Sequence, residues 1–335
     1  MNPILATSIL TLAAGLSLAP LCVDAQQSGE SKTAAGWTAP KTPWGHPDIQ
    51  GLWPSTEWKG VPLQRAESLG TRNTLTTEEF AARERQSAKE AASDAEEFAA
   101  PSAADSKPGS NPPEYWQDRG KPKMQASLIV SPDNGRLPPL TAEAEARVAA
   151  RQAARKSRGP ADSWLDRSLY ERCITKGPMN FLPGTYNNGH EILQDKNYIV
   201  IRHEMINQAQ MIPLDGRPFT GIRTYMGESR AHWEGQTLVV ETKNYLTNGL
   251  AIGDTPVSED LKVTEKFTRT GDHSLKYAAT VEDPKTWSQP WTMAFEITED
   301  PEYPLYEYAC HEGNYALANI LKGARAAEAA RRKKP

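Results

Sequence analysis

The second half of the chain alternates between apolar and polar residues in short runs that turn-forming residues separate. In residues 291–298 (WTMAFEIT), the large apolar side chains occupy every second position and therefore share one face. A period of two is typical of a half-buried β-strand. Similar runs predict further strands at residues 197–204, 207–213, 219–226, 227–233, 236–243, 261–269, 274–282 and 305–310.

About nine strands in this order, with no helical run between them, predict a mainly β fold with antiparallel neighbours. An open sheet exposes two edges that can pair with other chains, and closure removes both edges. We therefore expect an antiparallel up-and-down barrel, lipocalin-like in its connections, over residues 160–312. A strongly curled sheet is the alternative.

Two peripheral helices and a C-terminal helix are expected beside the barrel. Residues 76–100 begin with Thr76 and Glu79, a spacing that predicts a capping box. Residues 141–156 begin in the same way at Thr141, and Asn314 is the expected N-cap of a helix at residues 315–330. Residues 26–72 are rich in Pro, Gly and Trp, and they predict an extended arm whose tryptophans serve as anchors.

The first residues predict export. Residues 4–21 carry no charge, and Val23-Asp24-Ala25 fits the small-x-small pattern of a signal-peptidase site. A membrane anchor or a lipoprotein attached at Cys22 is the alternative. We therefore divide the chain into a signal peptide (1–25), an arm with an acidic helix and a linker (26–125), and a barrel domain with its C-terminal helix (126–335). The mature protein is expected to be periplasmic or secreted, with no transmembrane segment.

Composition and charge narrow the function classes. The chain has 335 residues, of which 38% are hydrophobic and 24% charged, and its formal net charge is −4. That balance supplies a core and offers no basic surface for nucleic acid. The chain has no nucleotide-binding glycine loop, no G-x-S-x-G elbow, no H-E-x-x-H and no C-x-x-C pair. We expect no organic cofactor.

Export changes the interpretation of the cysteines. Cys22 leaves with the signal, so Cys173 and Cys310 remain, and an even number in an oxidising compartment favours one disulfide. Two buried free thiols are one alternative. In the other, Cys310 is a nucleophile and the adjacent His311 its base.

Several sequence tags resemble a large family of exported bacterial proteins. The tags are PWGHPDIQGLW, SLIVSPDNGRLPPLT, RSLYERCI, LPGTYNN, IPLDGRP, GESRAHWEGQTLVVET, TVEDPKTW and LYEYACHEGNY, and they extend over nearly the whole mature chain. The resemblance implies a common architecture and an exported location. It implies no mechanism.

The strands carry polar residues that suit chemistry in a barrel. We expect Glu204, Arg230 and His232 to face the interior, with Glu204 and His232 as catalytic acid and base and Arg230 binding substrate. A buried carboxylate has a raised pKa, and an imidazole exchanges protons near neutrality. The alternative is a structural ion pair between Arg230 and Glu204.

A second group is expected at the barrel rim. The Cys173–Cys310 bond would place His311 and Glu312 close to Asp166 and Arg172, as further catalytic and substrate-binding residues. Tyr186 and Asn187, just before the first long strand, are expected to bind substrate as well. The alternative is a salt-bridged latch that closes the barrel. Six scattered histidines, among them His190 and His203, lack a short metal-ligand spacing, so we expect no metal site.

These patterns predict an exported enzyme that performs lyase, isomerase or hydrolase chemistry on a small, partly apolar organic substrate. A lipocalin-like protein that binds such a molecule unchanged is the first alternative. A structural envelope protein is the second.

Overall fold

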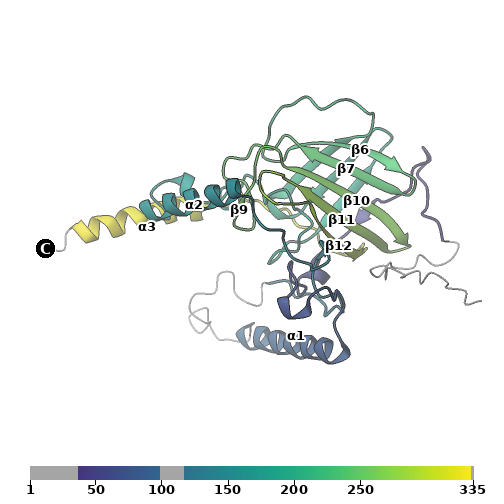
Figure 1. Cartoon of the computed structure of the whole chain (residues 1–335), viewed down its shortest axis with the longest axis horizontal. Coiled ribbons are helices and arrows are strands. Elements are labelled where there is room, and N and C mark those ends of the chain that lie inside the picture. The colour runs from purple at the N-terminus through teal and green to yellow at the C-terminus, as the bar shows by residue number, and fades with distance from the viewer. Residues whose placement is uncertain (1–36, 99–116, 333–335) are drawn as a thin grey trace, which may run out of the picture. The chain divides into compact units, whose positions relative to one another are not determined.

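Two antiparallel sheets supply the main framework, and the computed structural model describes it over residues 37–98 and 117–332 (Figure 1). The predicted signal peptide, the first part of the arm and the linker at residues 101–113 lie outside the described residues. The four-stranded sheet has the order β1-β3-β4-β5. Its strands are β1 (Gly51–Leu52), β3 (His190–Gln194), β4 (Tyr198–His203) and β5 (Gln208–Pro213).

The six-stranded sheet has the order β2-β12-β11-β10-β7-β6. Its strands are β2 (Ile129–Ser131), β12 (Trp291–Thr298), β11 (Ser274–Glu282), β10 (Lys262–Gly271), β7 (Thr237–Lys243) and β6 (Glu228–Glu234). A separate pair consists of β8 (Ala251–Ile252) and β9 (Thr255–Pro256). Seven of the nine predicted strands are therefore confirmed as antiparallel neighbours. Strand β3, at residues 190–194, was not predicted by the pattern.

The prediction of a closed barrel is wrong. Within the described residues, the backbone ladders stop between β5 and β6, which belong to different sheets. A side-chain bond from Gln210 Nε2 to Ser229 Oγ, 2.6 Å long, joins these two strands. The edges that closure would have removed are therefore bridged here by side chains.

Two predicted strands are loops. Around residues 219–226 the backbone amides of Thr220 and Gly221 donate to the Glu228 carboxylate, and Gly221 has a φ of 81°. These bonds hold a turn that a strand could not form. Residues 305–310 form no ladder with any strand in the described part of the chain, and the disulfide holds their end at Cys310.

The core lies between the two sheets. Phe181, on the loop before β3, contacts His190 and His203 of one sheet, at ring-centroid distances of 4.1 and 5.4 Å. It also contacts Phe267 and Tyr277 of the other sheet, at 5.4 and 4.6 Å. Side chains therefore fill the space in which the barrel cavity was expected.

The three helices begin where the sequence predicts. They are α1 (Thr77–Phe98), α2 (Ala142–Ser157) and α3 (Tyr315–Arg332). The Thr76–Glu79 capping box is present in both directions, and Thr141 accepts from the Ala144 amide. Asn314 accepts from the Leu317 amide at 3.2 Å. Among the helices in the described ranges, none has the length and apolar composition to span a lipid bilayer.

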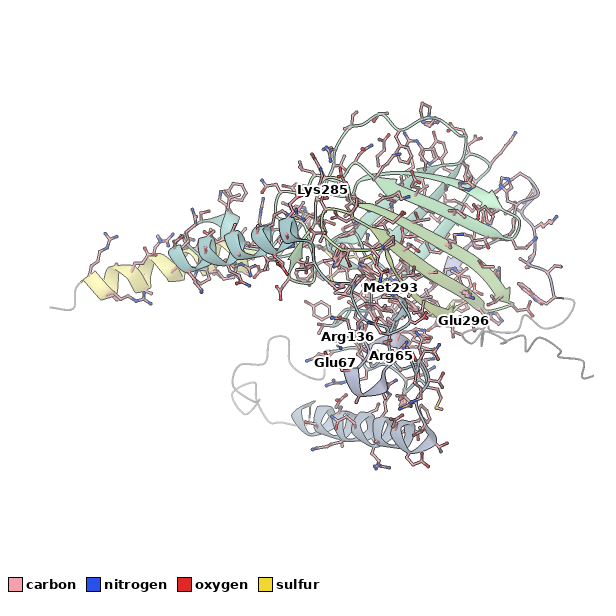
Figure 2. All side chains as sticks on the ribbon, viewed as in Figure 1. Arg65, Glu67, Arg136, Lys285, Met293 and Glu296 are labelled. Atoms are coloured by element: carbon pink, nitrogen blue, oxygen red, sulfur yellow. A yellow bond between two sulfur atoms is a disulfide. The ribbon has the colours of Figure 1, made fainter. Side chains whose placement is uncertain are left out.

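Tryptophans anchor the arm, as predicted. Trp53 is fully buried, and Trp58 is 7% exposed and donates to the Glu296 carbonyl of β12. Farther along, Arg65 is buried, and its carbonyl accepts from Arg136, which also pairs with Glu67 at 3.2 Å (Figure 2). These contacts hold residues 53–67 against the six-stranded sheet and its neighbouring loop.

Candidate functional site

A buried carboxylate, Glu204, follows β4 and is the centre of a polar cluster. Only 2% of Glu204 is exposed. Its Oε1 accepts from Asn187 Nδ2 at 2.8 Å, and its Oε2 accepts from the Gly189 amide at 3.1 Å and from the Tyr303 hydroxyl at 2.8 Å. Three donors therefore satisfy both oxygens, which is what a buried carboxylate requires.

The backbone around Glu204 is in an uncommon conformation. Asn187, Ile206 and Asn207 have φ angles of 56°, 63° and 50°. Left-handed backbone costs about 1–3 kcal/mol at a residue other than glycine, and it is least expected for β-branched Ile206. The Asn207 amide donates to the Glu204 carbonyl at 2.9 Å. Such strain concentrates at functional sites, so it supports a site here.

A second carboxylate, Asp118, lies close to Glu204. Its Oδ2 accepts from Asn188 Nδ2 at 2.8 Å and from Thr56 Oγ1 at 3.3 Å. Its Oδ1 has no hydrogen-bond partner among the described residues. Burial raises the pKa of Asp118, the bonds from Asn188 and Thr56 offset part of that, and the charge of Glu204 raises it further.

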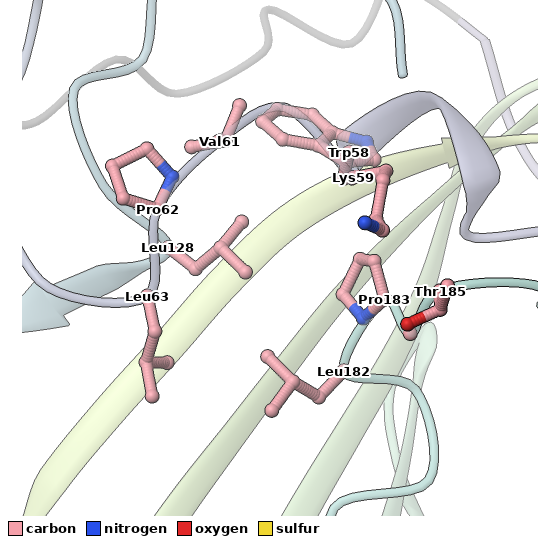
Figure 3. A pocket seen from close by; sticks show the side chains of 10 residues that line it. Trp58, Lys59, Val61, Pro62, Leu63, Leu128, Leu182, Pro183 and Thr185 are labelled. Carbon is pink, nitrogen blue, oxygen red and sulfur yellow. The ribbon is translucent and has the colours of Figure 1, made fainter. Parts of the chain in front are cut away.

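A pocket of about 330 Å³ adjoins Asp118 (Figure 3). The connection is the Thr185 carbonyl, which accepts from the Asp118 amide at 2.7 Å, while Thr185 itself lines the pocket. The remaining wall is mainly apolar and consists of Trp58, Val61, Pro62, Leu63, Leu128, Leu182 and Pro183. The volume lies at the low end for small-molecule sites.

Lys59 is the one cation among the residues that line this pocket. Figure 3 shows its ammonium group and the Thr185 hydroxyl on the same side of the pocket. The Lys59 side chain makes no hydrogen bond or ion pair with a residue in the described ranges, and it interacts electrostatically with Asp118. The pocket therefore has mainly apolar walls and one cation, and the half-buried Asp118 carboxyl group lies beyond its wall, next to Thr185.

The predicted grouping of Glu204, Arg230 and His232 is wrong. On β6 the buried side chains are Ser229 and Ala231, so the opposite parity faces the core. Arg230 pairs with Glu228 on the outer face. The His232 side chain is 62% exposed and lies 3.1 Å from Glu234. The alternative Arg230–Glu204 ion pair is absent as well, because Arg230 pairs with Glu228.

Of the other predicted residues, Asn187 joins the Glu204 cluster, and Tyr186 lies beside it. The Tyr186 hydroxyl is 3.3 Å from that of Tyr170. Asp166 and Arg172 line a separate cavity, where Arg158 pairs with Asp166 at 2.9 Å.

His311 and Glu312 are exposed, and neither side chain makes a hydrogen bond or ion pair with a described residue. The salt-bridged latch is therefore not formed by these two residues.

The Cys173–Cys310 disulfide is confirmed, with the two Cα atoms 5.7 Å apart. Asn314, the expected N-cap, bridges this junction, whereas His311 and Glu312 do not. Its Nδ2 donates to the Glu171 carbonyl at 3.0 Å and to Cys173 Sγ at 3.2 Å. A helix N-cap and a disulfide are thus joined at one point.

The histidines lie in separate places. His190 and His203 are adjacent in the core, with 2.9 Å between their Nδ1 atoms, whereas His232 and His311 are exposed elsewhere. Within residues 37–98 and 117–332, no group of three or more His, Cys, Asp or Glu side chains could hold a metal ion.

Sequence reasoning missed Asp118, Lys59 and Tyr303. Asp118 follows the linker and a Tyr-Trp pair, a return of aromatic residues that signals renewed packing. Tyr303 lies between two prolines in PEYP, in a loop, where functional side chains are common. Lys59 carries no local signal.

A substitution at Gly189 tests how closely Tyr303 packs over Glu204. A Cβ at this position would lie 2.5 Å from Tyr303 Cε1, 2.7 Å from Leu305 Cδ1 and 2.9 Å from Glu204 Oε2. We expect Gly189→Ala to lower the free energy of unfolding by about 1–3 kcal/mol, because the loop must move. Gly323→Ala on α3, where no atom lies within 4 Å, is the control and should cause no loss. Equal stability of the two variants in urea would contradict the close packing.

Comparison with protein-family models, with curated proteins and with solved structures found no match. The family resemblance seen in the sequence tags therefore stays a prediction.

Proposed function

We propose that the chain binds a small, partly apolar molecule in the 330 Å³ pocket and acts on it by acid/base chemistry, without an organic cofactor. The observation that carries the proposal is the neighbouring pair of carboxylates, Asp118 and Glu204, of which Asp118 is joined through its amide to Thr185 in the pocket wall. Two carboxyl groups in different environments divide acid and base roles between them.

Asp118 is the proposed general acid/base. Its Oδ1 has no partner in the described part of the chain, while Asn188 and Thr56 hold Oδ2 and so orient the group. Because burial and the charge of Glu204 raise its pKa, Asp118 takes up a proton more readily than an exposed aspartate. It can therefore give a proton to a substrate oxygen or nitrogen and take it back.

Glu204 is a positioning residue in this proposal. Asn187, Gly189 and Tyr303 occupy both of its oxygens, so it does not reach a ligand directly. Its charge acts on Asp118 instead. The sequence-based proposal of Glu204 as a catalytic group thus becomes an electrostatic role.

Lys59 and the apolar wall define the ligand. An unpaired ammonium group beside Thr185 favours a carboxylate or a polarised carbonyl oxygen at one end of the molecule. Trp58, Leu63 and Leu182 favour an apolar body. Lyase, isomerase and hydrolase reactions of small carbonyl compounds all fit this arrangement.

The test is a thermal-shift screen of small organic acids, esters and amides, followed by product analysis of each hit. For a hit that turns over, we expect Asp118→Asn to keep binding and to lower kcat by about 10²–10⁴-fold. Glu204→Gln should move the pH–rate profile of the Asp118 group to lower pH, because a like charge is removed.

The matched control is Glu234→Gln, which removes an exposed carboxylate next to His232. It should leave binding, kcat and the pH profile unchanged. Full turnover by Asp118→Asn would refute the proposed chemistry.

Binding without turnover is the second candidate, and the complete occupation of Glu204 favours it. In that case hits bind and no product forms, while Lys59→Gln weakens the binding of organic acids more than the binding of amides. The disulfide fits an oxidising compartment, and we propose a periplasmic or secreted location on that ground.

A further inference from the structure

A second cavity, of about 660 Å³, is lined by an excess of arginines. It lies between the C-terminal half of α2 and residues 158–172, and it shares no lining residue with the 330 Å³ pocket. Five guanidinium groups and two carboxylates line it: Arg151, Arg155, Arg158, Arg167, Arg172, Asp166 and Glu171. The lining therefore carries three uncompensated positive charges.

The two carboxylates are fully engaged. Asp166 accepts two bonds of 2.9 Å from Arg158, one to each oxygen. Glu171 pairs with Arg167 and also accepts from the Ser168 amide and hydroxyl at 3.0 Å. Neither is free to neutralise Arg151, Arg155 or Arg172.

Arg172 is oriented and unpaired. Its guanidinium carbon lies 4.4 Å from the centre of the Trp164 ring. A guanidinium group stacked by its face keeps its N–H donors in the plane, where they bind the two oxygens of a carboxylate or phosphate. Arg172 makes no side-chain hydrogen bond within the described residues, so those donors are available.

Arg151 is a half-buried cation without an ion pair among the described residues. Burial lowers its pKa, Arg155 lowers it further, and Asp254 acts in the opposite direction from outside the cavity lining. Arg155 lies in the last turn of α2, where it offsets the helix dipole. Asp162, next to the cavity, lies 3.8 Å from Arg325.

We propose that this cavity binds a small oxyanion with two or more negative charges, a phosphate or a polycarboxylate, between Arg151 and Arg172. A multivalent anion matches the three uncompensated charges and the forked geometry of guanidinium groups. The volume is ordinary for a small organic ligand.

The probes are inorganic phosphate and citrate, with acetate as the monovalent control, in titration calorimetry on the full protein at low ionic strength. We expect phosphate or citrate to bind more tightly than acetate. Arg151→Gln and Arg172→Gln should each raise the dissociation constant about tenfold or more, the usual effect of losing a charged hydrogen bond. Binding of phosphate alone or citrate alone identifies the preferred oxyanion.

Three variants complete the test. Arg85→Gln on α1 is the matched control and should bind like the wild type. Arg172→Lys keeps the charge and loses the planar fork, so it should fold and still bind more weakly. If neither probe exceeds acetate, or if the double variant Arg151→Gln, Arg172→Gln binds as the wild type does, the proposal is wrong.

Discussion

Reduction of the Cys173–Cys310 disulfide is expected to lower the free energy of unfolding by about 5 kcal/mol. The bond closes a loop with a sequence separation of 137, and the chain-entropy model assigns this effect to a loop of that length. The loss is large relative to the stability of a typical domain.

Urea unfolding with and without a reductant measures this effect. The double variant Cys173→Ser, Cys310→Ser should match the reduced protein and should not respond to the reductant. Thiol titration of the unfolded, unreduced chain should detect neither Cys173 nor Cys310. Two reactive thiols, or equal stability with and without reductant, would contradict the result.

Acid should destabilise the protein through the two core histidines. His190 and His203 face each other through Nδ1 atoms 2.9 Å apart, so one must donate and the other accept. Burial lowers the pKa of His190 well below its ordinary value, and burial and nearby Lys176 lower that of His203 to about 3. Both imidazoles are therefore neutral in the folded protein near pH 5.

The sign of the effect follows from the unfolded chain. There both histidines titrate near pH 6.5, so their stabilising contribution is complete above that pH and is lost as the pH falls. At pH 5 each imidazole that stays neutral in the folded state costs about 2 kcal/mol. His190→Gln and His203→Gln should each remove about half of this dependence.

Glu265 has the opposite effect on the pH dependence of stability. Burial raises its pKa from 4.5 to about 7, and the Tyr277 hydroxyl bond of 2.8 Å lowers it in part. Its contribution is complete below pH 4.5 and is lost as the pH rises through 7. Glu265→Gln should therefore raise stability at pH 8, by about 3 kcal/mol on the linkage scale. The same substitution should also make the loss of stability that the two histidines cause between pH 7 and pH 5 steeper. A free energy of unfolding that does not change with pH, in the wild type or in Glu265→Gln, would contradict these assignments.

Local patterns predicted the strands and helix ends because those are set by near neighbours. The alternation in residues 291–298 reappears unchanged in β12, and the Thr76–Glu79 capping box needs only three residues. The prediction of which β6 side chains face the core was wrong for a physical reason. Arg230 and Glu228 neutralise each other on the outer face, which leaves the small Ser229 and Ala231 for the core.

The candidate site depends on contacts that no local pattern encodes. Tyr303 reaches Glu204 across 99 residues, and Asn188 reaches Asp118 across 70. Glu204 and Asn187 could be predicted as polar groups near strand ends, since Glu204 directly follows β4 and Asn187 lies in the loop before β3. Asp118 and Lys59 come from segments that lack periodicity, so only the packed chain places Lys59 in the pocket wall and Asp118 against Thr185.

The most direct test of the proposed site is a substitution that fills the pocket. Leu63 lines it, and Leu63→Trp adds an indole to a space of about 330 Å³ (Figure 3). Leu246→Trp, at a side chain 38% exposed elsewhere, is the control. For a ligand found by thermal shift, titration calorimetry should show that Leu63→Trp loses binding, while Leu246→Trp and the wild type bind equally. Unchanged affinity in a folded Leu63→Trp variant would show that the ligand binds elsewhere.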